Sequence, residues 1–426
     1  MSNNRKKIHY AWWILLGLVI MVGFAKGGIM TAGGLFLTPV TEDLGMGIGS
    51  LSVYFGISSI VTMIFLPFAG KMIAKYNIRV ILVASIILEA GSFAMFGFMN
   101  SVWGWYAFAV PMAIGSTFVT QIAGPVLINN WFKKHNGLAI GIMVASGGAF
   151  GAILQPMAGN LIASEGWRST YITLGVIVMV VVIPVVLLIL RTSPKQKGLQ
   201  PYGVDEVEQV DKQITVKTTS ATTTSSGVTA AVAKKSSAFY ALLIFFFFIT
   251  SISAFGQHVA PFAMGLGYDV TFAGNAMGGW QIGVLVGALT FGILSDKIGA
   301  KNTAIFAMLL GLVPLGILIL VPENAMMFTL AIGIYGFVVA SLGTLGPLLT
   351  AALFGSKEYS QIYASAVIGL AIAGVVALPG YGFVFEFTGS YTLALYAIAS
   401  MLIMNVVAIV LAFRGKKKLE KAGLWN

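Results

Sequence analysis

Residues 270–301 read VTFAGNAMGGWQIGVLVGALTFGILSDKIGAK, and this stretch decides the fold class. Its first 25 residues contain no charged side chain, and an α-helix needs about 20 such residues to cross a bilayer. A short polar turn with Asp296, Lys297 and Lys301 follows. The stretch therefore predicts a transmembrane helix that ends in a charged loop at the membrane surface.

Apolar blocks of similar length occur on both sides of this stretch. The residues AVILMFWYC make up 58% of the 426-residue chain and charged residues only 9%, which excludes an ordinary soluble domain. The sequence thus predicts an all-α integral membrane protein with twelve transmembrane helices. The expected spans are residues 11–37, 50–70, 79–99, 102–126, 137–163, 170–190, 238–264, 270–294, 302–321, 325–354, 361–385 and 391–413.

The basic residues predict the orientation of these spans. If the N-terminus is cytoplasmic, 23 of the 25 Lys and Arg residues lie on the cytoplasmic side, as the positive-inside rule requires. The exceptions are Arg168, in the loop after the fifth span, and Lys26, inside the first span. We expect a multi-pass protein of a cell membrane, most simply a bacterial cytoplasmic membrane, with both termini cytoplasmic. A net charge of +11 distributed over short loops does not indicate a nucleic-acid partner.

A polar central loop divides the chain into two similar halves. Residues 192–237 contain RTSPKQKG, an acidic run and TTSATTTSSG, a composition that favours a tether over a packed domain. We expect one six-helix bundle over residues 1–191 and another over residues 238–426. WFKKHNGLAIG after the fourth span resembles LFGSKEYSQIYA after the tenth. Repeated halves around a midplane site are typical of secondary transporters, and we expect a monomer.

The loop after the eighth span resembles the loop signature of the major facilitator superfamily. GILSDKIGAK has glycine, three residues, aspartate, a basic residue, any residue, glycine, any residue and a basic residue. The glycines allow close helix approach and a turn, and the aspartate can pair with basic groups. The loop after the second span is a degraded copy, with Ala74 and Asn77 in place of the aspartate and the second glycine. The conformational latch implied by this resemblance comprises Gly70, Arg79, Gly292, Asp296, Lys297 and Gly299.

Within that superfamily, three segments are similar to the branch of monocarboxylate porters and oxalate/formate exchangers. These segments are WFKKHNGLAIGI, GWRSTY and FGSKEYSQIYA. The resemblance implies the major facilitator fold of two six-helix bundles and transport of small organic anions, with a proton or by exchange. The chain departs from this branch at Ala288 or a near neighbour, where many relatives have an arginine, and its eleventh span has no lysine.

Two ionisable residues are expected near the middle of the membrane, where charge is costly and usually functional. Lys26 lies in the glycine-rich segment GFAKGGIMTAGG of the first span, and we expect it to contact a substrate carboxylate or to take part in coupling. A structural ion pair or snorkelling is the alternative. Glu89 in the third span is a candidate proton carrier, or else a buried neutral acid that partners a polar group.

Other polar residues within the spans are candidates for the substrate site. His258 could titrate or donate to a carboxylate, and the alternative is a hydrogen-bonded residue at a helix interface. The uncharged candidates have the same alternative, since polar side chains also join neighbouring helices. They are Gln121, Gln281, Tyr335 and Thr344.

No cofactor, metal or enzymatic activity is expected. The chain has no cysteine, only three histidines and no phosphate loop of the form GxxxxGK[ST]. We expect alternating access about a midplane site, with an organic anion accompanied by a proton or a counter-substrate as the partners. The alternative is a proton-driven exporter of amphipathic compounds or drugs, because the glycine and proline pattern at residues 147–159 also occurs in drug-exporting relatives.

Overall fold

A computed structural model describes residues 9–204 and 227–425 of the chain, and its regular structure is helical. Ten helical stretches are long and apolar enough to cross a membrane, and two of them contain two spans each. These two are divided by Gly166 and Gly299, whose φ angles of 78° and 82° favour glycine and redirect the chain. The prediction of a twelve-helix membrane fold is confirmed.

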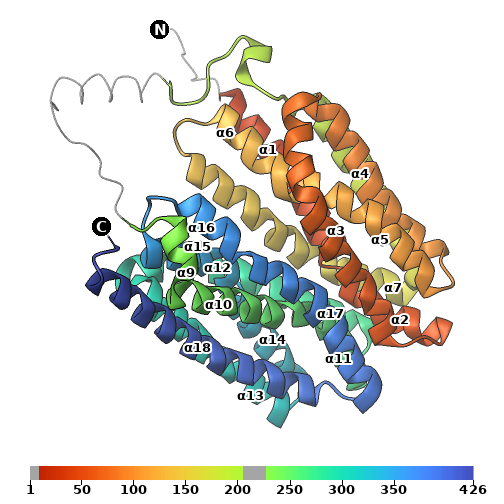
Figure 1. Ribbon diagram of the computed structural model, residues 1–426. Helices are drawn as coiled ribbons and strands as arrows, with labels where there is room; N and C mark the ends of the chain where they lie inside the picture. Colours follow the sequence, from red (N-terminus) through yellow and green to blue (C-terminus); the bar gives the residue numbers. More distant parts are fainter. Residues whose placement is uncertain (1–8, 205–226, 426) are drawn as a thin grey trace, which may run out of the picture.

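The first half of the chain forms one bundle (Figure 1). Its first span consists of α1, η1 and α2, its fourth of α5, η3 and α6, and its fifth and sixth of α7. The bounds are α1 Tyr10–Val22, η1 Gly23–Met30, α2 Gly33–Leu44, α3 Ile48–Lys75, α4 Ile78–Met95, η2 Phe96–Phe98, α5 Val102–Ser116, η3 Thr117–Ile122, α6 Ala123–Trp131 and α7 Asn136–Leu188.

The second half forms the other bundle, after the short helices η4 (Pro194–Lys197) and α9 (Ala230–Lys235). Its seventh span consists of α10, η5 and α11, and α12 with α13 makes the eighth and ninth. The bounds are α10 Ser237–Ala254, η5 Phe255–His258, α11 Val259–Gly265, α12 Val270–Leu310, α13 Leu312–Leu320, α14 Ala325–Val339, α15 Ser341–Phe354, α16 Tyr359–Ala366, α17 Ile368–Thr388 and α18 Thr392–Lys421.

Two span boundaries differ most from the sequence prediction. The first span continues to Leu44 because its helix resumes after the irregular segment at residues 23–32. The last helix continues to Lys421, so its final two turns lie beyond the apolar span that was predicted. There, Lys416 donates a hydrogen bond to the carbonyl of Ala352 near the end of α15. Helix formation does not stop at the membrane boundary when the following residues are good helix formers.

The first span of each half and the fourth span of each half are irregular in the middle. The first and fourth spans contain the π-helices η1 and η3, the seventh contains the 3₁₀ turn η5, and the tenth is interrupted at Ala340. Such interruptions leave backbone groups without partners inside their own helix, and they often mark functional sites. The regular helices α3, α7, α12 and α17 flank these four spans and form the main contacts between the bundles.

The two bundles meet on one side of the molecule. We call this the distal side; it bears the loops at residues 45–47 and 389–391, whereas the terminal side bears residues 9 and 425. On the distal half, Gly159 lies against Gly274, and Gly49 lies against Gly382. The ribbons of the bundles diverge towards the terminal side (Figure 1). The contacts between bundles therefore close the molecule distally.

The described ends of the central loop pack against the terminal side of each bundle. Tyr202 forms backbone hydrogen bonds with Trp131 and Lys133 just after α6, and its ring contacts Trp12. In the other half, the Val228 amide donates to the carbonyl of Phe354 at the end of α15. The acidic run and the TTSATTTSS segment lie outside the described residues.

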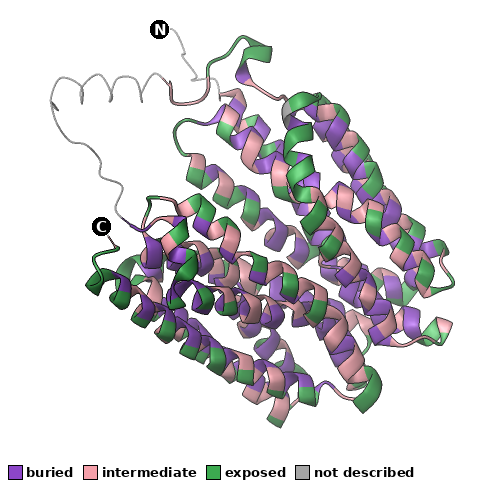
Figure 2. Cartoon of the chain, viewed as in Figure 1, coloured by how far each residue is buried: buried purple, intermediate pink, exposed green. Residues whose placement is uncertain are grey.

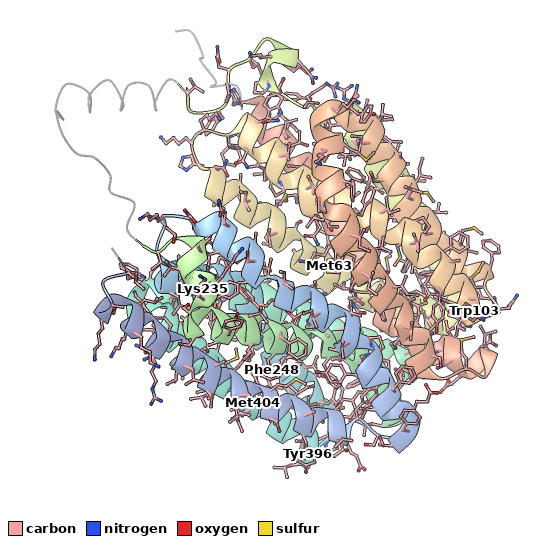
Figure 3. The ribbon with its side chains drawn as sticks, in the orientation of Figure 1. Met63, Trp103, Lys235, Phe248, Tyr396 and Met404 are labelled. Carbon is pink, nitrogen blue, oxygen red and sulfur yellow. The ribbon has the colours of Figure 1, made fainter. Side chains whose placement is uncertain are left out.

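The outward faces of the bundles expose apolar side chains, as a lipid-facing surface requires. Figure 2 shows exposed residues along the outer face of α18, where Met404 is 51% exposed. Trp103, which is 75% exposed, lies at the distal start of α5 (Figure 3), a position typical of membrane-interface tryptophans.

Candidate functional site

A central cavity of about 660 Å³ lies between the bundles. Residues of the first, second, third, fourth, seventh and eleventh spans line it, and most of them are apolar or aromatic. Met63 of α3, labelled in Figure 3, is one of them. The polar lining side chains are those of Tyr54, Ser58, Ser59, Thr62, Glu89, Ser116, Gln121, Thr250 and Gln257.

Of the acidic and basic side chains that the structure describes, Glu89 is the one that lines the cavity. It is 1% exposed. Its Oε1 has no hydrogen-bond partner in the described part of the chain, and its side chain interacts with the Ser116 hydroxyl. The backbone of α5 approaches closely here, because a Cβ on Gly115 would lie 2.7 Å from the Glu89 nitrogen. An unpartnered carboxyl oxygen beside a cavity can accept a proton or a hydrogen bond from a bound molecule.

Lys26 lies within η1, one turn before the lining residue Met30. Its side chain is exposed, although the residues on either side of it, Ala25 and Gly27, are buried. The lysine stem rests on Gly147 of α7, where a Cβ would lie 2.8 Å from its Cδ. Within the described residues, Lys26 forms no ion pair and no hydrogen bond, so a pair with Glu89 is absent from this conformation.

Gln155 of α7 fixes the irregular segment around Lys26, and the sequence analysis missed it. Its Nε2 donates to the Thr31 hydroxyl at 2.7 Å and to the carbonyl of Gly27 at 3.2 Å. The π-helix supplies this carbonyl, because widening the turn frees backbone oxygens from their usual partners. An amide residue within an apolar span, directly before Pro156, is the signal that could have indicated it.

The two other glutamines lie in different surroundings. Gln121 of η3 is exposed and lines the cavity, and its amide has no partner among residues that the structure describes. Gln281 of α12 is 5% exposed and packs against the other bundle, where a Cβ on Gly151 would lie 2.8 Å from its Cγ. Gln281 and Lys26 thus contact successive turns of the same helix, α7, from different bundles.

His258 is fully buried and does not line the cavity. Its Nε2 lies 2.8 Å from the carbonyl of Leu378, and its Nδ1 lies 3.0 Å from the Tyr391 hydroxyl. Because a carbonyl can only accept, Nε2 holds the proton and Nδ1 accepts from the tyrosine. Both ring nitrogens are therefore engaged in joining η5 to α17 and the start of α18.

Tyr335 and Thr344 of the tenth span are also outside the cavity lining. The Tyr335 hydroxyl donates to the carbonyl of Ile252 at 2.8 Å, and the ring is buried against Trp280. The Thr344 hydroxyl lies 3.3 Å from the carbonyl of Ala340 in its own helix, at the interruption of the span. In this conformation both side chains contact protein atoms within the second bundle.

The residues of the expected latch lie on the terminal side. Gly299 turns the chain between the eighth and ninth spans, and its φ of 82° is the reason for a glycine there. Asp296 and Lys297 are exposed, and neither belongs to an ion pair in the described chain. Among the described residues, nothing lies within 4 Å of the Cβ position of Gly292, so no described part of the chain covers its helix face here.

The second copy of the latch differs. In the described part of the chain, Gly70 is likewise uncovered, with nothing within 4 Å of its Cβ position. Arg79 donates from Nε to the carbonyl of Leu190 at 2.8 Å, just after the end of α7. A guanidinium at this position satisfies a carbonyl beyond the last helical turn, so Arg79 joins the third and sixth spans within one bundle.

The cavity and the paired bundles agree with comparisons to known proteins. The chain is similar to the uncharacterized MFS-type transporter YhjX of Escherichia coli (strain K12), at 24% identity over 85% of this chain and 86% of that protein. It is also similar to the oxalate:formate antiporter of Oxalobacter formigenes, at 24% identity over 44% of each chain.

Solved structures support the same fold. A bacterial homolog of the human lysosomal transporter Spinster, in an inward-facing and occupied conformation, superposes with a TM-score of 0.73. The match covers 98% of this chain and 99% of that one at 14% identity. The sequence pattern of the Major Facilitator Superfamily matches residues 15–274 and 241–424. The chain therefore belongs to the major facilitator superfamily and is a membrane transporter, not an enzyme.

Proposed function

We propose that this protein is a secondary transporter of a small organic anion with an apolar body, and that Lys26 binds the carboxylate. The supporting observation is an ammonium group within a membrane span that has exposed surface and no partner among the described residues. An uncompensated charge at a helix centre costs about 2.5–3.5 kcal/mol on insertion scales. A bound carboxylate compensates this charge for as long as the substrate is present.

The cavity lining supports an apolar body on the anion. Small-molecule sites typically have volumes of about 300–1,000 Å³ with few polar groups, and the volume of about 660 Å³ falls in this range. Lys26 is not a lining residue but lies one turn before Met30, which is. A carboxylate at Lys26 thus leaves the rest of the molecule against aromatic and methionine side chains. Gln121 and Gln281 are the amide donors that we assign to the same substrate.

Coupling is assigned to Glu89, because it is the carboxyl group that lines the cavity and one of its oxygens is unpartnered. If Glu89 takes up a proton when the anion binds and releases it when the anion leaves, the net charge of the site is the same in the loaded and the empty cavity. The membrane-spanning region then gains no net charge in either state, and such a charge would be costly there. His258 and Tyr335 are assigned to the framework of the second bundle, since their polar atoms already have protein partners. We assign Thr344 to the hinge of the tenth span.

We further propose that the terminal side is cytoplasmic, because most Lys and Arg residues belong to that side. The conformation described above is then inward-facing, with the distal contacts closing the extracellular end. Asp296 and the uncovered Gly70 and Gly292 belong to surfaces that approach each other when the terminal side closes. Rocking of the two bundles about the central site would complete the transport cycle.

Export of amphipathic compounds is the second candidate, and the apolar lining with a buried carboxyl is the observation that favours it. In that case Glu89 would pair with the cationic group of the substrate, and Lys26 would have no direct role. The two candidates make opposite predictions for substitution of these two residues.

The deciding experiment is binding and counterflow in liposomes with panels of organic acids and of amphipathic cations. Breaking a desolvated charge pair typically costs about 2–5 kcal/mol, so Lys26→Gln should weaken organic-acid binding by about thirtyfold to several thousandfold. Lys26→Arg should restore only part of it, since a planar guanidinium differs in shape from an ammonium. Lys357→Gln, a change at an exposed lysine on the terminal side, is the matched control. If Lys26→Gln binds organic acids normally while Glu89→Gln loses amphipathic cations, the exporter assignment replaces ours.

A further inference from the structure

Two side chains of the second bundle reach across the distal side to backbone groups of the first. Gln257 accepts a hydrogen bond at Oε1 from the Gly34 amide at 2.9 Å, and its Nε2 donates to the Met30 carbonyl at 2.9 Å. Glu386 accepts at Oε2 from the amides of Gly49 at 3.0 Å and Ser50 at 3.4 Å. Side chains thus cross between bundles, and each meets the beginning of a helix.

Gln257 bridges the interruption of the first span. Met30 is the last residue of η1 and Gly34 is the second residue of α2, so the break leaves an acceptor and a donor four residues apart. A carboxamide has both a donor and an acceptor and can satisfy both groups at once. The backbones are also in close contact here, because a Cβ on Gly34 would lie 2.3 Å from the carbonyl oxygen of Gln257.

Glu386 takes the position of an N-terminal cap on α3, the 28-residue helix of the second span. A carboxylate is favourable there because the first amides of a helix lack partners and the helix dipole is positive at this end. Gly47, the N-cap residue of α3, provides no side-chain cap of its own. A cap supplied by the other bundle is lost when the bundles separate, which leaves the start of α3 unsatisfied.

We infer that Gln257 and Glu386 hold the distal side of the transporter closed, as two interbundle caps that form in this conformation and break in the opposite one. Gln257 also lines the cavity, so the closure begins at the wall of the substrate site. The inference rests on the proposed alternating access of the two bundles, and it does not depend on which molecule is transported. Removing either cap shifts the population towards the conformation that is open on the distal side.

The absence of cysteine from the sequence makes this population measurable. Thr62 lines the cavity on α3, and Thr62→Cys places a reporter thiol there. The full-length protein is reconstituted in liposomes and treated with a membrane-impermeant maleimide from the distal or the terminal side. Loss of one hydrogen-bonded helix cap corresponds to about a twofold to tenfold change in the ratio of the two conformations.

Gln257→Leu and Glu386→Ala should each speed distal labelling by about twofold to tenfold and slow terminal labelling. Their combination should multiply the two effects, because the caps are separate contacts between the same two bodies. Glu386→Gln keeps an acceptor oxygen and should lie closer to the parent. Thr250→Val removes a hydroxyl of the same cavity wall that has no hydrogen-bond partner among the described residues, and its labelling should match the parent.

Unchanged labelling from both sides in the double variant would overturn the inference, and so would an equal acceleration by Thr250→Val. A variant that merely misfolds would lose labelling from both sides or gain it from both, which the reciprocal measurement separates from a shift between conformations. The organic-acid binding experiment with Lys26→Gln is independent of this outcome. Either proposal can therefore fail while the other stands.

Discussion

Two adjacent glycines of η1, Gly27 and Gly28, pack against different kinds of atoms. A Cβ on Gly27 would lie 2.6 Å from the Gly151 nitrogen and 2.9 Å from the Gly147 oxygen, and both atoms are backbone. A Cβ on Gly28 would lie 3.1 Å from Cδ1 of Leu154, the tip of a flexible side chain. Gly27→Ala therefore forces two helices apart, whereas Gly28→Ala requires only a side-chain adjustment.

The expected difference follows from the contacts that are lost. Overpacking typically costs about 1–3 kcal/mol. Separation of the helices also weakens the hydrogen bond from Gln155 to the Gly27 carbonyl, which contributes about 0.5–1.5 kcal/mol. The gain in helix propensity from glycine to alanine is common to both variants and cancels in their comparison. Gly27→Ala should thus be less stable than Gly28→Ala by about 2–4 kcal/mol.

Thermal unfolding in detergent, followed by tryptophan fluorescence, measures this difference, and Gly27→Ala should melt several degrees below Gly28→Ala. Since the Lys26 stem rests on Gly147, Gly27→Ala should also weaken organic-acid binding more than Gly28→Ala does. Equal melting temperatures for the two variants would refute the argument that backbone contact between η1 and α7 sets the position of Lys26.

Three further predictions concern orientation, switching and coupling. In intact cells, an impermeant maleimide should label Glu323→Cys on the distal side and not Lys235→Cys on the terminal side; the reverse pattern would invert the proposed topology. Asp296→Asn should slow transport in liposomes severalfold while substrate affinity changes by less than about threefold, because the group is exposed and is not one of the cavity-lining residues. Normal turnover in that variant would remove Asp296 from the latch. Glu89→Gln should abolish uptake driven by a proton gradient, since the amide cannot take up the proton; persistent gradient-driven uptake, read with a pH-sensitive dye, would exclude Glu89 as the carrier.

The sequence predicted the helices well because a bilayer imposes a length and a composition that each span must show. The turn at Gly299 was also predictable, since its motif requires a left-handed backbone at that glycine. The interruption at residues 23–30 was not. A glycine-rich stretch is compatible with a regular helix, and the π-helix depends on Gln155 binding to it from another span.

The hydrogen-bond partners of the candidate site residues were the feature that the sequence predicted least well. His258 was a reasonable candidate from its position, but only the fold shows that Leu378 and Tyr391 occupy both ring nitrogens. The neighbouring Gln257 lines the cavity, which His258 does not, and its role depends on backbone groups more than 220 residues away in the chain. Hydrogen bonds to main-chain atoms of a distant helix leave no pattern in a single sequence.

The contacts at the described ends of the central loop determine where the chain can be cut into two fragments, one for each bundle. Tyr202 belongs structurally to the first bundle and Val228 to the second, because each pairs with the chain that follows the fourth span of its own bundle. The separable units therefore include Tyr202 and Val228, which lie beyond the last membrane helix of the first bundle and before the first membrane helix of the second. Fragments cut at the membrane boundaries would leave Trp131 and Phe354 without their backbone partners. Fragments that keep these short extensions retain complete terminal faces, which makes them the better parts for split-protein reassembly or for exchange of halves between relatives.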